Sequence, residues 1–103
     1  MTCEVDKRDG RVHIRGEMTI YGAAALKDEL FAAFAPVSDA CSVDLAGVSE
    51  LDTTGIQILI MAQRACAARG APFSLANPSD VVREALELLR VRNLPVTTTE
   101  TSV

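Results

Sequence analysis

The alternation of apolar and polar residues at the start of the chain predicts two short β-strands. Residues 2–8 alternate between apolar and polar types, and residues 11–15 do the same. A period of two places alternate side chains on opposite faces of a strand. Asp9 and Gly10 lie between the two segments and are typical of a hairpin turn. We therefore expect the chain to open with an antiparallel hairpin that has one apolar face and one wet face.

Apolar residues spaced three and four positions apart predict three helices after the hairpin. The first is alanine-rich and is expected to end at Pro36, which cannot continue a helix. The second is closed by Gly70, and the third begins with Asn77 as its N-cap and Pro78 in its first turn. The predicted elements are helices over residues 21–35, over residues 54–69 and from residue 78 onward, with strands over residues 41–46 and 71–76. The core faces of the helices are expected to hold Leu26, Leu30, Ala33 and Phe34, then Ile56, Leu59, Ala62 and Cys66, then Val81, Ala85, Leu88 and Leu89.

This order of elements predicts the fold class. Strands that are joined through helices pair in parallel with right-handed crossovers. We therefore expect an α/β fold with the order ββαβαβα, in which helices pack against a small open mixed sheet of about four strands with an antiparallel edge. Residues 1–96 are expected to form a single domain, and residues 97–103 a polar tail that is frayed.

Charge and composition narrow the expected partners. The 103 residues carry a formal net charge of −4, and the ten lysines and arginines do not cluster in sequence. A nucleic-acid-binding domain is expected to carry a basic face, so nucleic acid is not expected as a partner. No apolar run approaches the roughly 18 residues of a membrane span. The N-terminal residues are polar rather than typical of a signal peptide. The sequence therefore predicts a cytoplasmic protein without membrane insertion.

Signs of catalysis or of cofactor binding are weak. The single histidine, His13, lies between basic residues on the outward face of its strand and is interpreted as a surface residue. The odd, scattered set Cys3, Cys41 and Cys66 is interpreted as reduced core thiols. The chain has neither GxGxxG nor GxxxxGK[ST], and no metal-ligand spacing. We expect no enzyme activity, no metal and no cofactor. A small enzyme, the alternative, would require a deep pocket with a strongly perturbed acid or base.

The segment from Asp52 to Gly55 is the most specific feature of the sequence. It joins an apolar strand signal to an apolar helix signal, and it contains a carboxylate, two hydroxyls and a glycine. Thr53 and Thr54 are therefore expected where free backbone N–H groups and the positive end of the helix dipole face outward. A hydroxyl at such a place caps the helix, receives a phosphoryl group or contacts a partner. The local pattern leaves these roles open.

The residues around this turn resemble a known family. The segment from Val43 to Ser49, the turn from Asp52 to Gly55, and the run from Gly16 to Met18 before the first helix are similar to the STAS domain. This domain is shared by bacterial anti-sigma factor antagonists and by the tails of sulfate transporters. The resemblance spans nearly the whole chain and implies the STAS-type fold. It also implies that Thr54, the hydroxyl residue directly before the glycine, is the phosphoacceptor of a non-catalytic regulator. Such a regulator binds a partner kinase or anti-sigma factor when unmodified and is released when phosphorylated.

Two positions depart from the pattern of the antagonists. Thr19 stands where antagonists typically carry an aspartate, and the acceptor is a threonine where serine is usual. The segment from Glu17 to Tyr21 is closer to stand-alone STAS proteins that accompany chemotaxis or other sensory machinery. A third branch, the STAS subunit of phospholipid-transport ATPases, also often carries threonine at the signature. Two functions therefore stay open: a signalling adaptor switched by phosphorylation, and a constitutive docking subunit of a larger complex.

The partner surface is expected to continue along the outer face of the second helix. Gln57, Met61 and Arg64 recur on the side opposite the predicted core. Met61 is either an adaptable contact residue or packs under a neighbouring helix. Arg64 is either a solvated charge or a partner contact. The residues expected to bind a protein partner are Asp52, Thr53, Gly55, Gln57, Met61, Arg64 and Thr19.

Overall fold

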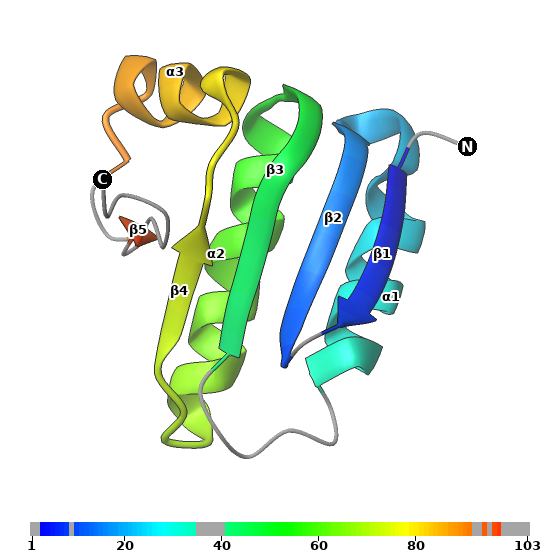
Figure 1. Cartoon of the computed structure of the whole chain (residues 1–103), viewed down its shortest axis with the longest axis vertical. Coiled ribbons are helices and arrows are strands. Elements are labelled where there is room, and N and C mark those ends of the chain that lie inside the picture. The colour runs from blue at the N-terminus through cyan, green and yellow to red at the C-terminus, as the bar shows by residue number, and fades with distance from the viewer. Residues whose placement is uncertain (1–2, 9, 35–40, 92–93, 95, 98–103) are drawn as a thin grey trace.

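The helices and strands follow the predicted order. The computed structural model describes residues 3–8, 10–34, 41–91, 94 and 96–97. The strands are β1 (Cys3–Arg8), β2 (Arg11–Met18), β3 (Cys41–Leu51), β4 (Phe73–Ala76) and β5 (Val96–Thr97). The helices are a short 3-10 helix η1 (Ile20–Gly22) followed by α1 (Ala23–Phe34), α2 (Thr53–Ala68) and α3 (Asp80–Leu88), as Figure 1 shows.

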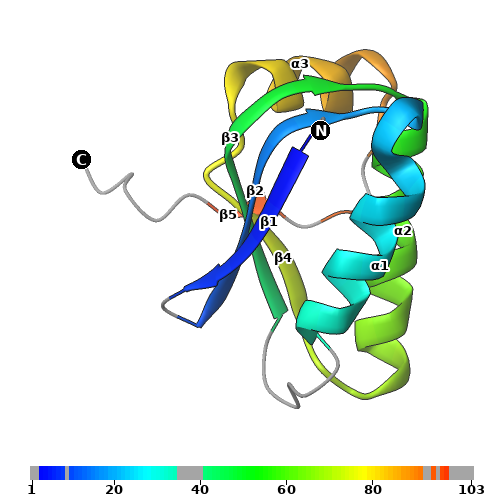
Figure 2. The same ribbon diagram turned by 90° about the vertical axis from the view of Figure 1, so that its right-hand side faces the viewer.

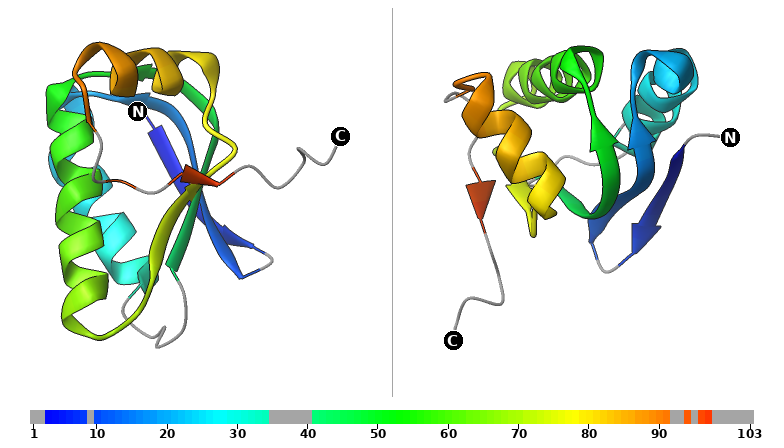
Figure 3. Two further views of the ribbon diagram at one scale, coloured as in Figure 1. Left: turned by 90° about the vertical axis from the view of Figure 1, so that its left-hand side faces the viewer. Right: turned by 90° about the horizontal axis from the view of Figure 1, so that it is seen from above.

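The strands form one open sheet in the order β1-β2-β3-β4-β5. β1 and β2 pair antiparallel, and all other neighbours pair parallel. Helices α1 and α2 cover one face of the sheet (Figure 2). Helix α3 instead lies across the end of the sheet and contacts β3 (Figure 3). The predicted α/β fold with an antiparallel edge is confirmed, and the short β5 is an addition that the sequence pattern did not indicate.

The predicted limits of the domain stay a prediction. The expected boundary after residue 96 falls within β5, because the next residue, Thr97, still pairs with Ala76 of β4. Residues 98–103 of the expected tail lie outside the described residues, as do Asp9 of the hairpin turn and Pro36 after α1.

The hydrophobic core lies between the sheet and the helices α1 and α2. Val12 and Ile14 of β2 and Val43 and Leu45 of β3 point into it and are almost completely buried. Full burial of one such side chain contributes about 1.5–3 kcal/mol. The helices add the predicted residues that are buried: Leu26, Leu30, Ile56, Leu59, Ala62 and Cys66. The predicted Ala33 is partly buried, and the side chain of Phe34 lies outside the described residues.

Strand β3 is longer than predicted. The sequence pattern ended it at Ala46, but it continues to Leu51. The second half of β3 pairs with the second half of β2, with two register shifts along the pair. Gly47, the pairing partner of Arg15, leaves room for that side chain, because a Cβ atom there would lie 2.6 Å from Cγ of Arg15. The predicted loop before Asp52 was therefore wrong, and only Asp52 itself separates β3 from α2.

Helix α3 begins two residues later than predicted. Ser79, not Asn77, is its N-cap: the Ser79 hydroxyl accepts from the Val82 N–H at 3.3 Å and donates to the Val48 carbonyl at 2.7 Å. Asn77 adopts a left-handed φ of 50°, and its amide donates to a carboxylate oxygen of Asp44 at 2.8 Å. Asn77 was mistaken for a cap because both roles favour the same residue type.

The buried face of α3 also differs from the prediction. Val82 and Leu86 are its buried residues. The expected Leu88 and Leu89 are 80% and 50% exposed, and Val81 is at the margin of exposure. The buried pair lies one residue after the predicted positions 81 and 85, which shifts the buried face by about 100°. Ala85 is partly buried against the core, as predicted.

The histidine was also misjudged as a surface residue. The side chain of His13 is 18% exposed, and its Nδ1 lies 3.9 Å from Oδ1 of Asp44. Asp44 is 7% exposed and accepts hydrogen bonds from the Ala46 N–H at 2.9 Å and from Asn77. Arg11 lies 3.8 Å from the same carboxylate. His13 and Asp44 are direct partners across the β2–β3 pair, a juxtaposition that the sequence alone did not reveal.

Candidate functional site

Asp52 holds together the turn that the sequence singled out. It is the N-cap of α2, and its Oδ1 accepts from the Gly55 N–H at 3.0 Å. Its Oδ2 accepts from the Ile20 N–H of η1, also at 3.0 Å. The Asp52 N–H in turn donates to the Met18 carbonyl at 3.2 Å. The carboxylate therefore joins the start of α2 to η1, while the backbone N–H joins it to the end of β2. The carboxylate also satisfies N–H groups that a helix start leaves unpaired.

Thr53 and Thr54 form the first turn of α2 directly after this cap. Thr53 is exposed and Thr54 is partly exposed, so both are accessible from outside. The cap is the carboxylate of Asp52, so capping by a threonine hydroxyl is not needed. A cap formed by Asp52 is what the sequence predicts for a simple capping turn, and the roles of the two threonines as acceptor or contact residues stay predictions.

Gly55 packs directly against β2 and is buried. A Cβ atom at this position would lie 2.4 Å from the Met18 carbonyl oxygen and 2.7 Å from Cδ1 of Leu51. Real Cβ atoms essentially never approach another atom closer than 3.0 Å. Gly55 therefore supports the turn from inside, and its burial leaves it no direct contact with a partner.

The outer face of α2 points away from the hydrophobic core. Gln57, Met61 and Arg64 are exposed, as predicted, and Met61 is 39% exposed. Met61 therefore does not pack under a neighbouring helix. This exposed face runs from Thr53 along the helix and is uncharged as far as Arg64.

Thr19 differs from the expected contact residue. It is 8% exposed, and within the described part of the chain its buried hydroxyl has no hydrogen-bond partner. The next two residues, which the sequence analysis did not select, are the exposed ones: Ile20 is 62% exposed and Tyr21 is 89% exposed. Their position next to the Asp52 turn is set by the Ile20–Asp52 hydrogen bond. No local pattern indicated this contact between residues 32 positions apart.

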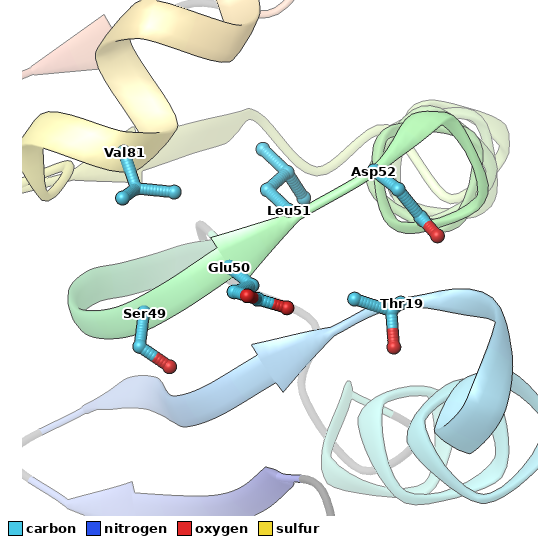
Figure 4. Close-up of a pocket in the computed structure, with 6 residues that line it drawn as sticks. All are labelled: Thr19, Ser49, Glu50, Leu51, Asp52 and Val81. Carbon is cyan, nitrogen blue, oxygen red and sulfur yellow. The ribbon is translucent and has the colours of Figure 1, made fainter.

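A cavity of about 360 Å³ lies beside the turn, as Figure 4 shows. It is lined by Thr19 after β2, by the end of β3, by Asp52 and by Val81 of α3. Neither Thr53 nor Thr54 lines it. No local pattern indicated this cavity, because its wall includes Val81, which the periodicity placed in the core.

The buried thiols lie far from this site. Cys66 is completely buried near the end of α2, and Cys41 begins β3 at the opposite end of the sheet from the turn. Burial and the neighbouring Cys41 thiol raise the pKa of Cys66 to about 12. Burial, together with Glu29, also raises the pKa of Cys3. Because a thiolate is the reactive form, the raised pKa lowers the reactivity of Cys66 and Cys3. All three cysteines are free; Cys41 and Cys66 are buried, and Cys3 is partly buried.

No group of three or more histidine, cysteine, aspartate or glutamate residues among the described residues is arranged to hold a metal ion. None of the helices described is long and apolar enough to cross a membrane.

Several solved structures share the fold of this chain. A putative anti-sigma factor antagonist from Thermotoga maritima is 18% identical, with a TM-score of 0.72 over 91% of this chain and 84% of that one. An anti-sigma factor antagonist from Mycobacterium paratuberculosis is 23% identical, with a TM-score of 0.74 over 92% and 83%. The unphosphorylated anti-sigma factor antagonist SpoIIAA is 18% identical, with a TM-score of 0.70 over 94% and 87%. At these identities the likeness concerns the fold.

The sequence itself identifies the family. No curated protein matches the chain. A family model described as "Mlab, STAS domain" matches residues 1–97, which include every described strand and helix. The chain therefore belongs to the STAS domain family.

Proposed function

We propose that this protein is a non-catalytic signalling adaptor of the anti-sigma factor antagonist type, switched by phosphorylation of Thr54. In the unmodified state it binds a protein partner through the turn from Asp52 to Gly55 and the outer face of α2. The partner is a serine/threonine kinase that acts as an anti-sigma factor, or a sensory protein. The single observation that carries the proposal is an accessible Thr54 in the first turn of a helix whose start is held rigidly from two sides.

The electrostatics of the turn support a switch that works without refolding. A phosphoryl group adds a charge of about −1.5 to −2. On Thr54 it would gain roughly 1 kcal/mol from the helix dipole and free N–H groups. The carboxylate of Asp52 opposes it, and two unit charges at 4 Å interact by about 4 kcal/mol at an effective dielectric of 20, before screening by salt. The helix term offsets only part of this repulsion, and screening by salt lowers the remainder because the turn lies at the surface.

A phosphate on Thr54 is expected to weaken partner binding more than it weakens the fold. The neighbouring surface of α2, with Gln57 and Met61, is neutral and would offer a phosphate no counter-charge. A phosphate buried there loses water without compensation. A loss of about 3 kcal/mol weakens binding roughly a hundredfold.

Phosphorylation is tested by mass. The purified protein is incubated with ATP and an extract of its source cells, and its intact mass is measured. We expect a gain of one phosphate in the wild-type protein and in Thr53→Ala, and none in Thr54→Ala. A phosphate that persists in Thr54→Ala would overturn the assignment. Thr53→Ala is the matched control because it removes the neighbouring hydroxyl from the same turn.

A constitutive docking subunit of a larger complex, such as a chemotaxis assembly or a phospholipid-transport ATPase, is the second candidate. The exposed pair Ile20 and Tyr21 favours it, because large apolar side chains at a surface are typical of a lasting contact. In this case the intact mass stays unchanged in every extract, and Thr54→Glu still co-purifies with the complex. Loss of the complex in Thr54→Glu, with an unaltered melting temperature, would favour the switch.

A further inference from the structure

Helix α3 carries a second apolar stripe that its own domain leaves uncovered. The stripe consists of residues at the spacing of one helix face, with the last at the C-cap: Val81, Ala85, Leu88 and Leu89. Helix α3 buries Val82 and Leu86 instead. Leu88 is more exposed than any other large apolar residue of the described ranges except Tyr21. We call these four residues the outer stripe of α3.

The spacing of the outer stripe distinguishes it from scattered surface residues. Single exposed apolar side chains are common and need no explanation. Here Val81, Leu88 and Leu89 are all exposed, and Val81 and Leu88 lie two helical turns apart on the same side. Apolar residues that recur in this way are typical of a helix face that packs against another element. The outer stripe therefore has the pattern of a contact surface.

The outer stripe adjoins the Asp52 turn. Helix α3 crosses the end of the sheet at which β3 passes into α2 (Figure 3). In Figure 4 the side chain of Val81 points from α3 toward the end of β3, where Glu50 and Leu51 lie. The stripe thus continues the surface around the turn onto α3 and is not an isolated patch.

The charged residues that border the outer stripe are acidic. Glu84 is exposed, and it is a surface neighbour of both Val81 and Leu88 because it lies three residues after the first and four before the second. Glu50 is exposed at the end of β3 beside Val81. Neither carboxylate forms an ion pair with another residue of the described ranges. The stripe therefore has a negative border without a counter-charge.

We propose that the outer stripe of α3 binds an amphipathic helix of the protein partner whose apolar face is bordered by lysine or arginine. The apolar side chains of such a helix cover Val81 and Leu88, as in other helix-to-helix contacts. The stems of its basic side chains lie along the edge of the stripe while their charges reach Glu84 and Glu50. The proposal rests on the proposed function, since it extends the partner surface of the Asp52 turn and gives the partner a chemical character.

Charge disfavours a second copy of this chain as the occupant. Two α3 helices packed about a two-fold axis through the outer stripe would bring the Glu84 carboxylates of both copies to the same border. Like charges at such a distance repel, and the whole chain carries a net charge of −4. A basic partner helix has no such repulsion to overcome.

The test uses a blocked, lactam-stapled helical peptide of about 15 residues, with leucines along one face and lysines on both borders of that face. It is titrated into the ¹⁵N-labelled full chain and followed by amide chemical shifts. We expect saturable shifts at residues 81, 84, 85, 88 and 89. The same peptide with glutamate in place of lysine is expected to bind about tenfold more weakly. Equal or tighter binding of the glutamate peptide, shifts confined to other residues, or no saturable shift up to about 1 mM would each overturn the proposal.

Two variants with matched controls place the contact on the outer stripe. Leu88→Gln removes apolar surface without opening a cavity, and we expect about tenfold weaker binding with an unaltered melting temperature. Leu88→Met keeps the apolar surface and should bind as wild type. Glu84→Gln should weaken binding of the lysine peptide about threefold, whereas Glu87→Gln, which makes the same charge change beside Arg83 on another side of α3, should not. Unchanged binding in Leu88→Gln or Glu84→Gln, or an equal loss in Glu87→Gln, would overturn the proposal.

The peptide-free protein tests the other occupants. A dimer in sedimentation that Leu88→Gln dissociates would mean that a second copy covers the stripe. Amide shifts at residues 98–103 in peptide-free Leu88→Gln would mean that the end of the chain covers it. Either result would overturn the proposal. Failure of the peptide titration leaves the mass test of Thr54 standing, and failure of the mass test leaves this contact standing, because the titration uses unphosphorylated protein.

Discussion

Replacing Gly55 by alanine is expected to destabilise the protein, although alanine is the better helix former. In an exposed helix the change from glycine to alanine stabilises by roughly 0.5–1 kcal/mol. At Gly55 the new methyl group would meet the Met18 carbonyl oxygen at 2.4 Å, Cδ1 of Leu51 at 2.7 Å and Cβ of Met18 at 3.0 Å. The first of these neighbours is backbone within the sheet and cannot turn aside.

The sign of the effect follows from which atoms must move. Relief of the contact requires α2 and β2 to separate by roughly half an ångström, because overpacked cores respond by shifts of backbone. Such a shift strains the hydrogen bonds from Ile20 and Gly55 to Asp52, both 3.0 Å long. Overpacking typically costs about 1–3 kcal/mol, and the contact at Gly55 is at the severe end of that range. After subtraction of the helix propensity, we expect a net loss of about 2 kcal/mol.

The assay is thermal and urea unfolding followed by circular dichroism. A loss of about 2 kcal/mol lowers the melting temperature of a domain of this size by roughly 8–16 °C. Gly70→Ala is the matched control at the other end of α2: its φ is +73° and its Cβ would meet nothing within 4 Å. That variant carries only the cost of a left-handed alanine, about 1 kcal/mol. A Gly55→Ala protein as stable as wild type would refute the packing argument.

Two further predictions concern buried polar groups. The pKa of Cys66 in the folded protein is about 12, above the ordinary value of 9.0, so the thiol of the unfolded chain loses its proton first as the pH rises. The contribution of the protonated thiol to the free energy of unfolding is therefore full below pH 9 and falls as the pH rises toward 12. Relative to Cys66→Ala, we expect this free energy to fall by up to roughly 1.4 kcal/mol per pH unit. Parallel stability profiles of the two proteins over this range would contradict it. For Asp44, substitution by alanine leaves the amide of Asn77 and the Ala46 N–H without this acceptor, and we expect urea unfolding to show a loss of about 2–4 kcal/mol. Asp44→Asn, which keeps one acceptor, should lose less, and an equal loss in both variants would argue against the hydrogen bonds as the cause.

Sequence periodicity predicted the features that depend on neighbours along the chain. The hairpin, the core face of α2 from Ile56 to Cys66 and the closure of this helix at Gly70 all follow from local spacing and residue type. The turn from Asp52 to Gly55 was predicted for the same reason. Its residues combine a capping side chain with a glycine, and both act within one helical turn.

The misjudged features depend on partners far away in sequence. β3 continues past Ala46 because β2 offers it an irregular partner strand. Asn77 leaves the cap position to Ser79 because a carboxylate on β3 binds its amide. Thr19 is buried by the arrangement of β3 and α3 around the end of β2, and the cavity exists for the same reason. No single-sequence pattern encodes such contacts, because each needs the tertiary arrangement to be known first.

The position of Asp52 explains how a site on this fold can combine rigidity with accessibility. Its carboxylate binds backbone groups on both η1 and α2, and thus fixes the two surfaces that flank Thr54 relative to each other. Tyr21 on one of these surfaces and Thr53 on the other are both exposed. A change at Thr54 then alters the chemistry of the surface while the backbone beneath it stays in place. It follows that Asp52→Asn, which retains only one acceptor oxygen, should affect partner binding through the geometry of η1 as well as through charge.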